Sequence, residues 1–199
     1  MFTHVNVGNE LIAIKEKFRE SLPMFLNSDK FVFFNILNFL GYHVTALFKN
    51  AYSASDCCSS VESIEKIFDI KYEVDNLKIM NSDQLNQIFT LSGNYLYKFR
   101  VMPKGMTFHT FIVIKYQNRW VILQSFCGIC GLHVNEDYRL PSLLSDFVQN
   151  PTGDLFNLLF ETNLEKYIKA NEANLTISYA NFTELPLENL RLLIVKFVQ

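Results

Sequence analysis

An apolar stretch, FHTFIVIKYQNRWVILQSF from Phe108 to Phe126, constrains the fold more than any other part of this sequence. Valine, isoleucine and aromatic residues dominate it, and these residue types are enriched in β-strands. The polar pair Gln117-Asn118 divides the stretch in two, which predicts a hairpin with strands at His109 to Tyr116 and Arg119 to Phe126. Both faces of this hairpin are apolar, so we expect it at the centre of a sheet.

Helical patterns precede and follow the hairpin. A capping box at Ser59 and Glu62, with an apolar stripe, predicts a helix that begins at Cys57 and Cys58. A second short helix is expected after a cap at Asn81. The other predicted helices are Asn9 to Pro23, Ser28 to Phe48, Pro141 to Gln149 and Asp154 to Lys169, and the other predicted strands are Asn94 to Val101, Leu175 to Phe182 and Leu190 to Val198, the last being ambiguous with a helix.

This order of elements, helices first and then an antiparallel sheet with further helices, predicts an α+β fold. A chain of 199 residues is long enough to bury a core without disulfides, so we expect a single domain. The net charge is −2 and no long Lys/Arg cluster occurs, which argues against a nucleic-acid surface.

The first residues lack the pattern of a secretory signal, so we expect a cytoplasmic protein with reduced cysteines. The uncharged run from Phe31 to Phe48 is the one membrane candidate. Its asparagines, His43 and Thr45 would be costly in lipid, so we interpret it as a buried helix and expect no membrane partner.

Cys57 and Cys58 are candidate nucleophiles. At the start of a helix, unpaired N–H groups and the positive end of the helix dipole favour a thiolate and can bind an oxyanion. Flanking Asp and Ser residues suggest that the pair is exposed. Cys58 is the preferred nucleophile, because Cys57 falls on the apolar stripe of the helix. A buried structural pair is the alternative interpretation.

His109 is a candidate general base at the first position of a strand. If the hairpin turns at Gln117-Asn118, Gln124 is the diagonal neighbour of His109 on the same face, about 7 Å away along the backbone. Its amide oxygen could then accept a hydrogen bond from the imidazole and fix its tautomer. A histidine at a strand end that is satisfied by solvent is the alternative.

Cysteine at a helix start, then histidine opening a strand, then an amide at the end of the next strand resembles the papain-like core of bacterial toxin and effector cysteine proteases and glutamine deamidases. The resemblance covers about Asn50 to Phe126. It implies Cys57 or Cys58 as nucleophile, His109 as base, Gln124 as orienting residue and Asn50 as an oxyanion-hole side chain. Such effectors usually carry Asp where this chain has Gln124, and a neutral amide cannot stabilise imidazolium by charge.

A second cluster, CGICGLH, places Cys127, Cys130 and His133 at a spacing that can hold zinc. Only one half-site is visible, so we interpret it as a glycine-rich turn with incidental thiols, and keep zinc and a redox pair as alternatives. Ser125 could suggest a serine hydrolase, but the G-x-S-x-G elbow is absent from the sequence. We therefore expect no cofactor.

These observations predict a papain-like thiol hydrolase that cleaves a peptide bond or a protein glutamine amide through a thioester. Its partner would be a protein substrate. Two other classes stay open: a non-enzymatic interaction protein with the same fold and a decayed site, and a zinc-stabilised structural module.

Overall fold

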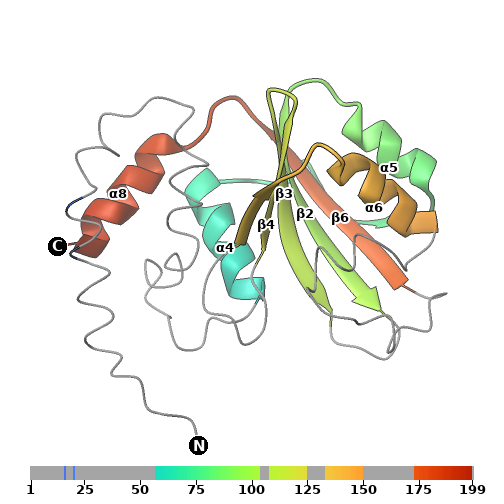
Figure 1. Ribbon diagram of the computed structural model, residues 1–199, viewed down its shortest axis with the longest axis horizontal. Helices are drawn as coiled ribbons and strands as arrows, with labels where there is room; N and C mark the ends of the chain where they lie inside the picture. The colour runs from blue at the N-terminus through green and yellow to red at the C-terminus, as the bar shows by residue number, and fades with distance from the viewer. Residues whose placement is uncertain are drawn as a thin grey trace, which may run out of the picture.

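A six-stranded antiparallel sheet with helices on both faces forms the computed structural model of the protein (Figure 1). The structure describes residues 57–103, 108–124, 133–149 and 173–198, together with Glu16 and Glu20, which are helical. The strand order is β1-β6-β2-β3-β4-β5. The predicted α+β class, with a central antiparallel sheet flanked by helices, is confirmed.

The described elements are four helices and the six strands of the one sheet. The described helices are α4 (Cys57–Phe68), α5 (Ser82–Phe89), α6 (Leu140–Gln149) and α8 (Leu187–Val198). The described strands are β1 (Val74–Ile79), β2 (Asn94–Pro103), β3 (His109–Tyr116), β4 (Arg119–Gln124), β5 (His133–Glu136) and β6 (Ala173–Phe182).

The predicted hairpin is β3 and β4, and it lies inside the sheet between β2 and β5. Gln117 and Asn118 both have positive φ angles, 48° and 65°, as the two central residues of a type I′ turn do. Tyr116 pairs with Arg119, which is the predicted register. The side chain of Asn94 on β2 accepts a hydrogen bond from the Gln117 N–H at 3.1 Å and so ties the turn to the neighbouring strand.

Several other expectations need correction or completion. Ser59 lies within α4, which begins at Cys57, so Ser59 does not occupy the expected cap position. The strands β1 and β5 were not predicted. The ambiguous last segment is a helix, α8. Asn81 caps α5 as predicted and accepts a hydrogen bond from the Gln84 N–H at 2.9 Å.

Some predicted helices cannot be compared with the structure. Apart from Glu16 and Glu20, the helices at Asn9 to Pro23 and Ser28 to Phe48 lie outside the described residues, as does Asp154 to Lys169. Within the described part of the chain, no helix is long and apolar enough to cross a membrane.

The two faces of the sheet have different helical covers, and this difference positions every candidate residue. On one face, α5 and α6 pack over the main apolar core, which contains Phe99 and Phe111 stacked at 5.2 Å. We call this the α5/α6 face. On the other face lies α4, with α8 beyond it (Figure 1). We call this the α4 face.

The type I′ turn predicts a measurable effect of substitution at Asn118. Asn118→Gly should stabilise the protein by about 0.5–1 kcal/mol, because glycine adopts a positive φ without steric cost, whereas Asn118→Val should destabilise it. Trp120, the single tryptophan of the chain, packs 5.1 Å from Phe89 and can report urea unfolding by fluorescence. Equal midpoints for the two variants would contradict this turn.

Candidate functional site

The hydrogen bond between His109 and Gln124 is present in the structure. Nε2 of His109 lies 3.1 Å from Oε1 of Gln124, and both residues are buried, with 6% and 4% of their surfaces exposed. This contact depends on the predicted hairpin register, which continues the pairing of Ile112 with Leu123. The expected imidazole–amide pair is therefore formed.

The pair belongs to the apolar core of the α5/α6 face. The His109 ring stacks on Phe111 at 5.8 Å, Phe111 stacks on Phe99, and Phe99 contacts Phe89 of α5 at 6.3 Å. Burial lowers the pKa of His109, and the hydrogen bond to Gln124 opposes part of this change. His109 is consequently a neutral imidazole near pH 7, held at the end of an aromatic stack.

The burial of His109 predicts that acid destabilises the fold. The unfolded imidazole has the ordinary pKa of 6.5 and the folded one a lower pKa, so below pH 6.5 the unfolded chain binds more protons. The free energy of unfolding should fall as pH drops through the interval between the two values. His109→Gln lacks this component, so the stability difference between wild type and variant should change between pH 7.5 and 5. A constant difference would contradict the buried neutral state.

Substitution of Gln124 tests the contact itself. Gln124→Glu places a carboxylate beside the imidazole and should raise the pKa of His109, measured by NMR titration. Gln124→Met keeps the length of the side chain but removes the acceptor. It should cost about 1–3 kcal/mol of stability, because a buried imidazole N–H loses its partner. An unmoved His109 pKa in Gln124→Glu would show that the two groups are not in contact in solution.

The candidate nucleophiles lie at the start of α4, as predicted, but on the other face of the sheet. Cys57 is buried, with 8% exposed, which corrects the expectation of an exposed pair, and Cys58 is half-buried. Side chains alternate along a strand, so Thr110 and Arg100, its partner on β2, point toward α4, whereas His109 points away from it. The predicted thiol–imidazole pair is therefore not assembled.

Cys58 instead lines a pocket of about 230 Å³ between α4 and the α4 face of the sheet. Polar and charged side chains surround it. The lining residues are Cys58, Val61, Glu62 and Glu65 from α4, Asn76 from β1, Lys98 and Arg100 from β2, Phe108 just before β3, Thr110 from β3, and Thr176 and Ser178 from β6.

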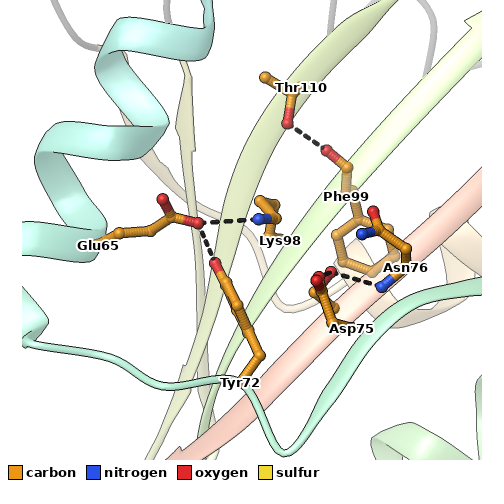
Figure 2. A network of polar contacts seen from close by, with 8 residues as sticks. Glu65, Tyr72, Asp75, Asn76, Lys98, Phe99 and Thr110 are labelled. Carbon is orange, nitrogen blue, oxygen red and sulfur yellow. Dashed lines mark hydrogen bonds and ion pairs between the residues drawn. The ribbon is translucent and has the colours of Figure 1, made fainter.

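A hydrogen-bonded network includes Glu65 and Lys98, two of the residues that line this pocket (Figure 2). Oε1 of Glu65 accepts hydrogen bonds from Lys98 at 3.0 Å and from the hydroxyl of Tyr72 at 2.6 Å. The Lys98 ammonium also lies 4.4 Å from the centre of the Tyr72 ring. Burial and the neighbouring carboxylate raise the pKa of Tyr72 well above its usual value. The network joins α4, β2 and the segment before β1, and it adds polar contacts to the buried apolar side chains of α4, such as Ile64 and Ile67.

An irregularity in β1 brings Asn76 to the pocket. The register of β1 shifts between Val74 and Leu77, and Asn76 has a φ of 53°. The Asn76 N–H donates to Oγ of Ser178 at 3.0 Å, and the Ser178 hydroxyl donates to Asp75 at 2.6 Å (Figure 2). Bulges of this kind are frequent next to functional sites, because they redirect a side chain.

Arg100 is the exposed cation of the pocket. Its guanidinium lies 3.9 Å from the centre of the Phe108 ring, so the aromatic ring holds the fork in place. It forms no ion pair with any carboxylate of the described residues. Its cross-strand partners are Thr176 on β6 and Thr110 on β3, so two hydroxyl-bearing residues flank it on the same face.

The metal alternative is not represented in the described residues, which contain no group of three His, Cys, Asp or Glu able to hold an ion. Cys127 and Cys130 lie outside the described part of the chain, as do Ser125 and Asn50. His133 is the first residue of β5 and pairs with Gln124 across the sheet. The zinc interpretation of this cluster stays a prediction.

The charged lining of the pocket was missed by sequence reasoning. Two signals were available: Lys98 and Arg100 alternate on one side of a strand, and Glu62 and Glu65 are three residues apart on one side of a helix. Neither signal shows that the two sets face each other, because that depends on which face of the sheet α4 covers.

Comparisons with known proteins found no match: no family model, no curated protein and no solved structure matches the chain.

Proposed function

We propose that the chain is a non-enzymatic binding protein that uses the pocket between α4 and the sheet as its ligand site. This is the decayed-site class that the sequence left open. The observation that carries the proposal is the placement of the candidate catalytic groups: Cys58 lines the pocket on the α4 face, while His109 is buried in the core of the opposite face.

The chemistry of the pocket supports binding rather than hydrolysis. A cysteine nucleophile needs a base within hydrogen-bond reach, and the described lining residues include no histidine. Lys98 is already paired with Glu65, and Ser178 already donates to Asp75. Arg100 and Glu62, by contrast, carry charges that no described residue neutralises. Such groups are suited to hold a charged ligand.

A papain-like thiol hydrolase is the second candidate, and the hydrogen bond between His109 and Gln124 favours it. An orienting side chain bonded to an imidazole is the arrangement that this chemistry requires. Activity would also require Cys57 or Cys58 to approach the imidazole on the α5/α6 face. Under this second candidate, the hydrogen bond between His109 and Gln124 would belong to a papain-like fold.

The rate of cysteine alkylation separates the two candidates. With Cys58 and His109 on opposite faces, the iodoacetamide labelling rate of Cys58 at pH 6, followed by peptide mass spectrometry, should be unchanged within about twofold by His109→Gln. A thiolate paired with imidazolium reacts far faster than an unpaired thiol at this pH. A drop of tenfold or more in the variant, with an unchanged melting temperature, would overturn the proposal in favour of the hydrolase.

A further inference from the structure

The lining of the pocket contains two pairs of opposite charges. We call Lys98 and Glu65 the closed pair, because they form an ion pair, and Arg100 and Glu62 the open pair, because neither forms an ion pair with a described residue. Glu62 and Glu65 are one helical turn apart on α4, and Arg100 and Lys98 are two residues apart on the same side of β2. Lys98 and Glu65 meet at 3.0 Å. Within the described part of the chain, neither Arg100 nor Glu62 forms an ion pair.

Each member of the open pair is accessible to a ligand. Arg100 and Glu62 are exposed, and both line the pocket. The guanidinium is held over Phe108 at 3.9 Å rather than being drawn toward Glu62, so its fork stays available for a carboxylate. A second donor is at hand, because the side chain of Thr176, the strand partner of Arg100, forms no hydrogen bond with another described residue.

The charge and volume of the pocket restrict the class of ligand. The two carboxylates and two cations of the lining sum to zero, so neither a polyanion nor a polycation is favoured. The cavity of about 230 Å³ is smaller than the roughly 300–1,000 Å³ typical of sites for drug-sized ligands. A small molecule that carries both signs satisfies both restrictions.

We infer that the pocket binds a free amino acid, with the ligand carboxylate on Arg100 and Thr176 and the ligand ammonium on Glu62. This inference rests on the proposed binding function and names its ligand class. The two charges of the ligand would neutralise Arg100 and Glu62, in the way that Lys98 and Glu65 neutralise each other. Both new contacts are charge-assisted hydrogen bonds, which are the stronger kind.

Four probes of similar size test the inference on the full chain by ¹⁵N–¹H NMR: L-alanine, propionate, L-alaninamide and inorganic phosphate. L-Alanine at millimolar concentration should shift the amide signals of Cys58, Arg100 and Thr176. Propionate, which lacks the ammonium, and alaninamide, which lacks the carboxylate, should bind at least about tenfold more weakly, because each loses one charge-assisted contact.

Matched variants assign the two contacts. Arg100→Gln and Glu62→Gln should each weaken L-alanine binding by about tenfold or more, whereas Asp83→Asn, at an exposed carboxylate of α5 on the other face of the sheet, should leave it unchanged. Thermal melts exclude loss of the fold. An unchanged affinity in either pocket variant would overturn the assigned contacts.

The outcomes also separate this inference from the function on which it rests. If propionate, phosphate or alaninamide shifts the same amides as strongly as L-alanine, the pocket binds ligands but the amino-acid class is wrong. If none of the four probes shifts any pocket amide, the inference fails, and the binding role proposed for this pocket fails with it.

Discussion

The register of β3 between β2 and β4 is the constraint on which the rest of the structure depends. Val101 pairs with His109 and Arg100 with Thr110, so neighbouring residues of β3 point to opposite faces of the sheet. A shift of one residue would exchange the two sets of side chains. In the observed register, His109 enters an aromatic core, and Thr110 faces a charged pocket. The separation of imidazole and thiol follows from this alternation.

The two faces are stabilised by different interactions. Stacked rings dominate the α5/α6 face, where Lys115 also donates hydrogen bonds to the carbonyls of Phe89 and Leu91 near the end of α5. On the α4 face, the ion pair between Glu65 and Lys98 joins the helix to the sheet. Half-buried ion pairs contribute little net stability, but they specify which groups come together. The α4 face also buries apolar side chains, among them Ile64 and Ile67 of α4 and Ile112 of β3, so its charged groups surround the pocket and do not cover the whole face.

The sequence predicted what depends on local pattern. The hairpin, its turn and the contact between His109 and Gln124 lie within one continuous segment, where strand alternation and turn position fix the geometry. The start of α4 and the cap at Asn81 were predictable for the same reason. The short strand β5 and the irregular strand β1 were missed, because neither shows a sustained alternation of apolar and polar residues.

The side of the sheet that α4 covers could not be predicted, and with it the composition of the site. This choice depends on contacts between residues far apart in the sequence, such as Glu65 of α4 with Lys98 of β2. A resemblance based on the order of Cys, His and Gln along the chain does not show on which face of the sheet each side chain lies. The sequence shows each of these residues but does not show that they line one pocket, so the candidate site was identified from the structure.

A spin label on Cys58 would test the central claim most directly. In a variant in which the other three cysteines are replaced by alanine, a nitroxide on Cys58 should broaden the Thr110 methyl signal much more than the His109 ring signals. Packing of sheet and helix layers at about 10 Å makes the difference measurable, because the two side chains point away from each other across the sheet. Stronger broadening of the His109 ring than of the Thr110 methyl would contradict the separation of thiol and imidazole.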